Sequence, residues 1–231
     1  MTKNIKTLIR RAAGVFCLGG MMLSAGLFTS CTEKDNTVEE FADWQSKNET
    51  YWNKLYTATQ QKIKSGDTSW KIILNYSYQN QKQTSGSALT YSPEDYIIAH
   101  VEQAGAGTTS PLYSDSVSMH YMGRLIPSTT YTSGLIFDKS WSNDTFNATT
   151  SRPAHSYLGL TYNAEGKAVS LVDGFTTALM SMHRGDHWTV YIPHQLGYGT
   201  SASGTVPAYS TLIFDLRLVD FSHPGTKLKD S

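Results

Sequence analysis

The segment that most constrains the fold of this chain lies at residues 211–219 (Thr-Leu-Ile-Phe-Asp-Leu-Arg-Leu-Val). Its large apolar residues alternate, which places Leu212, Phe214, Leu216 and Leu218 on one face of an extended strand. Aliphatic and aromatic residues of this kind favour strands. A strand with one apolar face must bury that face against another element. We therefore expect a strand here, packed against a hydrophobic core.

The same periodicity predicts further strands before this segment. Val117, Met119 and Tyr121 alternate up to Gly123, and residues 189–192 (Thr-Val-Tyr-Ile) are strongly β-forming. Short strands of this kind, separated by turn residues, are typical of antiparallel sheets.

One short helix is predicted between these strands. Asp173 is suited to cap its first turn, and Gly185 is suited to end it. Four apolar residues follow helical spacing between them: Phe175, Ala178, Leu179 and Met182. Several antiparallel strands with a single amphipathic helix indicate an α+β domain, in which a sheet is laid over one helix.

The region before residue 70 predicts a longer helix. Residues 37–40 (Thr-Val-Glu-Glu) have the form of a capping box, and Ser65-Gly66 ends a helix of about 27 residues. Aromatic and apolar residues recur at helical spacing within it: Phe41, Trp44, Tyr51, Trp52, Leu55 and Ile63. This stripe docks either on its own domain, which we favour, or on a second copy of the chain in a homodimer.

Two more strands are expected between this helix and residue 104. Alternating large residues predict a strand at 70–78, followed by a polar loop at 80–87. Residues 96–101 (Tyr-Ile-Ile-Ala-His-Val) predict a second strand, which the glycine-rich residues 104–107 bring to an end.

The N-terminus has the pattern of an export signal. A basic stretch from Lys3 to Arg11 precedes an apolar run from Ala12 to Phe28, which leads directly into Thr29-Ser30-Cys31. This junction resembles the lipobox of bacterial lipoproteins and implies that Cys31 becomes the acylated first residue of the mature protein. Phe28 departs from that pattern, because a smaller aliphatic residue is usual there. A transmembrane anchor is the alternative.

Charge and cysteine content exclude several classes of function. Basic and acidic residues number 19 each, and the first 30 residues contain four basic ones and no acid, so the remainder has 15 basic and 19 acidic residues. Because phosphate binding requires a basic surface, we expect no nucleic-acid partner. Cys17 lies within the signal, so the mature chain has no disulfide, cysteine metal site or cysteine nucleophile. Its stability must come from a packed core.

Eight short motifs in the second half of the chain occur together in one order. They are Val117-Ser-Met-His-Tyr-Met-Gly-Arg-Leu125, Gly134-Leu-Ile-Phe-Asp-Lys-Ser140, Leu158-Gly159, Leu171-Val-Asp-Gly-Phe-Thr-Thr-Ala-Leu-Met180, Met182-His-Arg-Gly-Asp186, Ile192-Pro193, Leu196-Gly-Tyr-Gly199 and Val206-Pro-Ala-Tyr-Ser-Thr-Leu-Ile-Phe-Asp-Leu216. Each motif alone is weak evidence, but all eight in this order resemble the FKBP-type peptidyl-prolyl cis–trans isomerase family. The resemblance spans about residues 95–221.

The resemblance implies an antiparallel half-barrel sheet wrapped around the short helix, with a shallow aromatic pocket between them. Carried over by position, the pocket is lined by Tyr121, Phe137, Asp138, Leu171, Val172, Tyr198, Val206 and Phe214, with Phe175 as its floor. Without the resemblance, most of the apolar residues in this list would be interpreted as ordinary core residues. Asp138 would be interpreted as a surface turn residue, and Tyr198 as a residue at the tip of a loop.

Departures from the family pattern affect the floor and the mouth of this pocket. Phe175 stands where well-known members have Trp, and Ala154 replaces an expected aromatic residue. The loop between Ser140 and Arg152 is long, and residues 160–168 form a further insertion. The resemblance therefore implies a remodelled pocket mouth, which affects the binding of the family's macrolide inhibitors more than the activity.

The implied activity needs no nucleophile, metal or cofactor. An apolar slot holds the prolyl ring and favours the twisted amide, with Phe137, Val172, Phe175 and Phe214 as the slot. The Tyr198 hydroxyl donates to a substrate carbonyl. Asp138 orients Tyr121, orients another group at the rim, or faces the rotating carbonyl carbon, and these three roles stay open.

Other functional patterns are weaker. His183 and His187 have a spacing found in metal sites, but Gly185 lies between them and no acidic third ligand is placed by pattern, so we expect no metal. A serine hydrolase lacks its G-x-S-x-G motif. The alternative to an active isomerase is a catalytically weak binding or chaperone module with the same fold.

These observations together predict a lipid-anchored protein of the bacterial cell envelope that acts on proline-containing polypeptides. We expect a signal peptide at 1–30, a tether, long helix and strand extension at 31–90, the isomerase domain at 91–223 and a C-terminal tail at 224–231.

Overall fold

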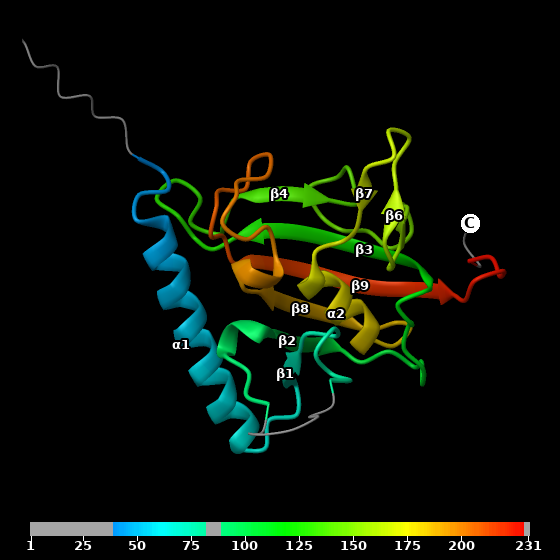
Figure 1. Cartoon of the computed structure of the whole chain (residues 1–231), viewed down its shortest axis with the longest axis horizontal. Helices are drawn as coiled ribbons and strands as arrows, with labels where there is room; N and C mark the ends of the chain where they lie inside the picture. The colour runs from blue at the N-terminus through cyan, green and yellow to red at the C-terminus, as the bar shows by residue number, and fades with distance from the viewer. Residues whose placement is uncertain (1–38, 82–88, 229–231) are drawn as a thin grey trace, which may run out of the picture. The chain divides into compact units, whose positions relative to one another are not determined.

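A computed structural model describes residues 39–81 and 89–228 of the chain (Figure 1). The predicted signal, the tether, Cys31 and Thr37 lie outside the described residues. The elements, in chain order, are α1 (Trp44–Lys64), β1 (Trp70–Leu74), the 3-10 helix η1 (Pro93–Asp95), β2 (Tyr96–Gln103), β3 (Ser116–Leu125), β4 (Ile136–Lys139), β5 (Ala154–Tyr157), β6 (Thr161–Tyr162), β7 (Ala168–Val169), α2 (Asp173–Ser181), β8 (His187–Ile192), the 3-10 helix η2 (His194–Leu196) and β9 (Leu212–Ser222).

The main sheet is antiparallel, with strands in the order β1-β2-β8-β9-β3-β4. β5 pairs with the first half of β3, and β4 pairs with its second half, on the edge of β3 that faces away from β9. β6 and β7 form a separate hairpin. Figure 1 shows α2 lying across one face of the sheet. The predicted α+β class, an antiparallel sheet around one short helix with a helix before it, is confirmed.

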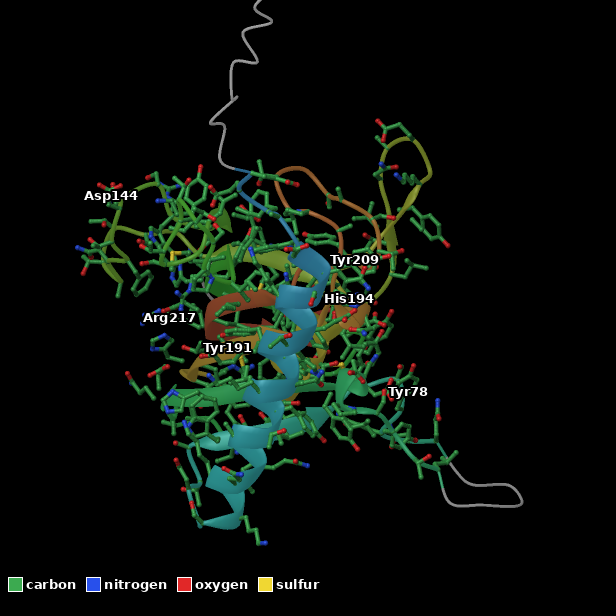
Figure 2. The ribbon with its side chains drawn as sticks, turned by 90° about the vertical axis from the view of Figure 1, so that its left-hand side faces the viewer. Tyr78, Asp144, Tyr191, His194, Tyr209 and Arg217 are labelled. Carbon is green, nitrogen blue, oxygen red and sulfur yellow. The ribbon has the colours of Figure 1, made fainter. Side chains whose placement is uncertain are left out.

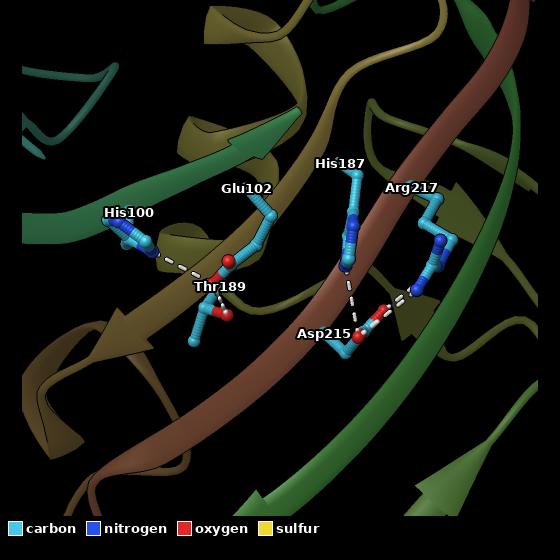
Figure 3. A network of polar contacts seen from close by, with 6 residues as sticks. All are labelled: His100, Glu102, His187, Thr189, Asp215 and Arg217. Atoms are coloured by element: carbon cyan, nitrogen blue, oxygen red, sulfur yellow. Dashed lines mark hydrogen bonds and ion pairs between the residues drawn. The ribbon is translucent and has the colours of Figure 1, made fainter. Parts of the chain in front are cut away.

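The two faces of the sheet differ in chemistry. Along β8, Trp188, Val190 and Ile192 are buried beneath α2, whereas the side chains between them point to the other face. That other face has a polar network in which His187 pairs with Asp215 at 3.0 Å, and Glu102 accepts hydrogen bonds from Thr189 and His100 (Figure 3). The hydrophobic core therefore lies between the sheet and α2.

Helix α1 packs on its own domain, near the ends of the strands (Figures 1 and 2). The Trp44 indole is buried in the core cluster, and its Nε1 donates to Ser210 Oγ at 2.8 Å. Asn48 Oδ1 accepts from the backbone N–H of Thr211 at 2.7 Å. Trp52 is buried as well. The aromatic stripe of the predicted helix thus contacts the same chain, which was the favoured of the two alternatives.

The predicted start of this helix is wrong. The helix begins at Trp44, after Asp43 in a left-handed conformation with φ 53°, and not at the capping box of residues 37–40. The Glu40 carboxylate accepts hydrogen bonds from Ser128 Oγ and from the backbone of Thr130 and Tyr131 instead. This distant loop binds the carboxylate that a local cap would have used. The predicted end is confirmed, because Ser65 is the C-cap and Gly66 follows with φ 92°.

Two other predicted boundaries also differ from the structure. The strand predicted at 70–78 ends at Leu74, because the buried Asn75 starts a turn in which its side chain accepts from the Ser77 N–H. Asp173 is the first residue of α2 and not its cap, which is the extended Val172. The helix ends at Ser181, since the extended Met182 inserts into the core before Gly185 turns the chain towards β8.

Contacts cross the predicted domain boundary at residue 90. β1 pairs along its whole length with β2, from Trp70 opposite His100 to Leu74 opposite Tyr96. The described residues, 39–81 and 89–228, belong to one compact unit. In the described part of the chain, α1 and β1 therefore belong structurally with the strands that follow residue 90. No helix among the described residues is both long enough and apolar enough to cross a membrane.

Candidate active site

A cavity of about 260 Å³ opens between the N-terminal end of α2 and strands β3, β4, β5 and β9. Its lining residues are Met119, Tyr121, Phe137, Asp138, Ala154, His155, Ser156, Ser170, Leu171, Val172, Phe175, Tyr198 and Phe214. Most of these side chains are apolar or aromatic, and few are charged. A small concave site with an apolar wall and a few polar groups is the usual form of a ligand-binding site.

Four aromatic rings pack edge to face in this cavity. Phe214 lies at the centre, with ring centroids 4.8 Å from Phe175, 5.6 Å from Phe137 and 6.3 Å from Tyr121. Tyr121 and Phe175 are 5.8 Å apart at 81°. This geometry suits the quadrupoles of the rings and holds each of them in one orientation. The rings come from β3, β4, α2 and β9, so the tertiary fold brings them together.

The close approach of two of these rings depends on Gly123. In the sheet, Gly123 lies opposite both Phe214 and Asp138. A Cβ atom at this position would lie 2.5 Å from Phe137 Cζ and 2.6 Å from Phe214 Cε1. Only glycine leaves space above the strand for both rings.

The polar side of the cavity is formed by Tyr121 and Asp138. The Tyr121 hydroxyl donates to Asp138 Oδ2 at 2.8 Å. Burial, followed by this hydrogen bond and the charge of the carboxylate, raises the pKa of Tyr121. The phenol therefore stays protonated at neutral pH and remains a donor to Asp138. Of the three roles that the sequence left open for Asp138, a partnership with Tyr121 is the one for which the structure has a contact.

Tyr198 lies at the mouth of the cavity, on the loop after η2, with 40% of its surface exposed. Burial, and secondly the charge of Asp138, raise the pKa of Tyr198. Within residues 39–81 and 89–228, no side chain or backbone group forms a hydrogen bond with the Tyr198 hydroxyl. It is therefore a protonated donor that is available to a bound molecule.

All of the predicted pocket residues except Val206 line this cavity. Val206 is only 2% exposed, belongs to the core cluster and bridges back to Ser203. It lies on the loop before β9 without reaching the cavity surface.

Several lining residues were not predicted. Met119 lies two residues before Tyr121 on β3, so strand alternation could have placed it on the same face. His155 and Ser156 come from β5, whose pairing with β3 has no clear local signal in the sequence. Ser170 precedes the predicted Leu171 and links it to the β6–β7 hairpin.

The two histidines with metal-like spacing have different partners. His183 Nδ1 lies 3.7 Å from Asp186, and His187 Nε2 lies 3.0 Å from Asp215. In the described ranges, no three or more His, Cys, Asp or Glu side chains gather in a way that could bind a metal ion.

The cavity and the fold define a class of protein that comparison with known families identifies. Residues 107–219 match the model of the FKBP-type peptidyl-prolyl cis-trans isomerase family. This part of the chain, which contains the whole aromatic cavity, is similar to that family.

Similar proteins come from several organisms. The macrophage infectivity potentiator of Trypanosoma cruzi is 33% identical over 149 residues, which cover 64% of this chain and 63% of that protein. The peptidyl-prolyl cis-trans isomerase Mip of Coxiella burnetii is 33% identical over 120 residues, covering 52% and 42%. The FKBP-type 22 kDa peptidyl-prolyl cis-trans isomerase of Escherichia coli is 30% identical over 130 residues, covering 56% and 52%. The chain thus spans less than two thirds of the length of each of these relatives.

Proposed function

We propose that this protein catalyses cis–trans isomerisation of Xaa-Pro bonds in polypeptides, and that the aromatic cavity is its active site. The observation that supports this most directly is the combination of four packed rings with the Tyr121–Asp138 pair and the available Tyr198 hydroxyl. The similarity to isomerases named above supports the same proposal.

The reaction sets a modest requirement on the site. Rotation about an Xaa-Pro bond is opposed by a barrier of about 18–20 kcal/mol, because the amide loses its conjugation in the twisted state. Each 1.4 kcal/mol by which the barrier falls gives roughly a tenfold gain in rate. The site therefore needs only to bind the twisted amide more tightly than the planar one, without covalent chemistry.

The apolar part of the cavity suits a prolyl ring. Phe137, Phe175 and Phe214 surround the space with ring faces and edges, and Val172 lies beside them at the start of α2. A prolyl ring in this space takes its amide out of water. Because the twisted amide is less polar than the planar one, removal of water favours the twisted form.

The polar groups act on the backbone around the proline. The Tyr198 hydroxyl donates to a carbonyl of the bound segment and holds it against the mouth of the cavity. Tyr121 holds Asp138 through Oδ2, so the carboxylate keeps a fixed position beside the rotating amide. In this proposal Tyr198 and Asp138 orient the substrate, while the aromatic rings provide the binding that distinguishes the twisted state.

Exchange NMR on a short Xaa-Pro peptide tests the proposal. Addition of the protein should increase the interconversion rate in proportion to its concentration, and Phe137→Ala should lower that effect while the protein remains folded. A folded wild-type protein that leaves the exchange rate unchanged would refute isomerase activity and leave a binding module as the function.

The proposal also includes a location for the protein. The basic and apolar leader that ends at Cys31 supports export and a lipid anchor in the bacterial cell envelope, where unfolded exported proteins are the clients. A homodimer through α1 would have to use the exposed face of that helix, because Trp44 and Trp52 are buried against the helix's own domain.

A further inference from the structure

The β6–β7 hairpin is inserted between two segments that line the cavity. Residues 154–156 line the cavity before the chain leaves for the hairpin, and residues 170–172 line it directly after the chain returns. The base of the hairpin is therefore continuous with the cavity rim. Figure 1 shows β6 and β7 extending away from the main sheet.

This hairpin exposes large apolar side chains. Tyr162 is 68% exposed, Leu160 is 48% exposed and Val169 is 46% exposed. Tyr157, at the end of β5, is also exposed. Leu160 and Tyr162 are two residues apart in the chain, whereas Val169 lies opposite Thr161, so its side chain is on the other face of the hairpin from Tyr162. Exposed apolar residues next to a binding site are a recognised mark of an interaction surface. We call Leu160, Tyr162 and Val169 the hairpin patch.

The hairpin is held in shape by its own turn. The Asn163 side chain accepts hydrogen bonds from the backbone N–H groups of Glu165 and Lys167, and Gly166 adopts φ 73° in the turn. Thr161 Oγ1 donates to the Val169 carbonyl across the two strands. The patch is thus presented on a formed element, which lowers the entropic cost of binding.

We propose that the hairpin patch is a second contact surface for the unfolded polypeptide whose proline occupies the cavity. This inference rests on the proposed isomerase function. The occupant is an extended client segment, because only such a chain can lie in the cavity and continue over its rim. Ser170 lines the cavity, and Ala168 lies two residues away opposite Tyr162. At about 3.3 Å per residue, the patch meets a client side chain roughly two to four residues from the proline.

The patch selects apolar client residues. Tyr162 and Val169 offer aromatic and aliphatic surface on opposite faces of the hairpin, and Leu160 adds to it at the base. Apolar client side chains that cover these residues remove apolar area from water. A tetrapeptide with proline at its third position extends at most two residues from that proline and so reaches only the near edge of the patch, whereas an unfolded protein can cover it fully. The hairpin therefore favours long clients over short peptides without altering the chemistry in the cavity.

The test compares two substrates on two matched variants. The hairpin variant is Leu160→Ser with Tyr162→Ser and Val169→Ser. The control variant is Ile63→Ser with Leu89→Ser and Val219→Ser, three exposed apolar residues that do not line the cavity. The substrates are an Xaa-Pro tetrapeptide and a protein whose refolding is limited by one prolyl bond, and melting curves report folding.

The hairpin variant should retain tetrapeptide kcat/KM within about twofold and lose about tenfold in catalysis of refolding. The control variant should retain both. Equal refolding rates in the hairpin variant and the wild type would overturn the inference while the isomerase function stands. A parallel loss on both substrates would also overturn it, because the hairpin would then only support the cavity. A wild type without tetrapeptide turnover would refute the proposed function itself.

A second measurement uses the wild type alone and so does not depend on how the variants fold. Two decapeptides differ only in having Leu or Ser at each position two to four residues from the proline. The Leu peptide should have a several-fold higher kcat/KM. Equal values for the two peptides would overturn the inference.

Discussion

The hydroxyl of Tyr121 donates to Asp138 Oδ2 over 2.8 Å and thereby joins β3 to β4 at the aromatic cavity. Gly123, two residues after Tyr121, lies directly opposite Asp138 in the same strand pair. The sheet register therefore determines the position of the carboxylate, and the phenol determines the direction in which it points.

Substitution of Tyr121 by Phe tests this relationship. Tyr121→Phe keeps the ring in the aromatic cluster and removes one hydrogen bond, worth about 0.5–1.5 kcal/mol. We expect kcat/KM on a short Xaa-Pro peptide to fall about three- to twelvefold. Asp138→Asn should reduce it by as much or more. The exposed Tyr157→Phe is the control and should have no effect. Unchanged activity in Tyr121→Phe would show that the orientation of Asp138 is not used.

The second prediction distinguishes the contribution of the Phe137 ring to the rate from that of the Tyr198 hydroxyl. Tyr198→Phe should lower the rate about three- to twelvefold without a change in melting temperature, because the hydroxyl is not used by the fold. Phe137→Ala removes a ring that no neighbour replaces and should reduce activity further, with some loss of stability. Both losses should be partial, since catalysis is noncovalent. Full activity in a folded Phe137→Ala/Tyr198→Phe double variant would place the active site elsewhere.

The third prediction concerns the pH dependence of stability. Hydrogen bonds from Ser128 and Thr130 lower the pKa of Glu40 to about 2 from an ordinary value of 4.5. A depressed folded-state pKa stabilises the protein above pH 4.5, and this contribution is lost as the pH falls towards 2. Glu40→Gln should therefore lower the melting temperature at pH 7, and its difference from wild type should shrink between these two values. A difference that is constant with pH would show that the charge of Glu40 is not involved.

The fourth prediction concerns the extent of the folding unit. A chain that starts at residue 39 should fold, whereas one that starts at residue 91 lacks β1 and the Trp44 indole of the core and should be strongly destabilised. Trp44→Ala in the full chain should cost about 3–5 kcal/mol, as for other buried aromatic side chains. Chemical denaturation measures both. Equal stability of the two shortened chains would restore the boundary near residue 90 that the sequence suggested.

The fifth prediction concerns the anchor. Cys31→Ser should abolish lipid attachment and move the protein from the membrane fraction to the soluble envelope fraction, or leave it uncleaved. Mass spectrometry of the mature N-terminus and cell fractionation measure these outcomes. A wild-type protein without lipid, or a variant that fractionates as the wild type does, would contradict the lipoprotein proposal.

Local sequence periodicity predicted the elements whose apolar residues repeat regularly. The alternating apolar residues of β3, β8 and β9 and the helically spaced apolar residues of α2 belong to the same buried core, which the spacing in the sequence indicates directly. The family resemblance then placed the aromatic residues of the cavity. These predictions succeeded because regularly spaced apolar residues on a strand or helix are buried together in any compact fold.

The tertiary structure decided the features that depend on partners distant in the chain. Glu40 binds the loop at residues 128–131, and α1 therefore starts at Trp44. Asn75 ends β1 where alternation predicted that the strand would continue, and its Oδ1 lies 3.4 Å from Thr177 Oγ1 in α2. The Tyr121 hydroxyl donates to Asp138, and the insertion predicted at 160–168 forms most of the β6–β7 hairpin beside the cavity rim. For Glu40, Asn75 and Tyr121 the physical reason is the same: a polar group bonds to whichever partner the packed fold brings within reach, and that choice is not encoded in its sequence neighbours.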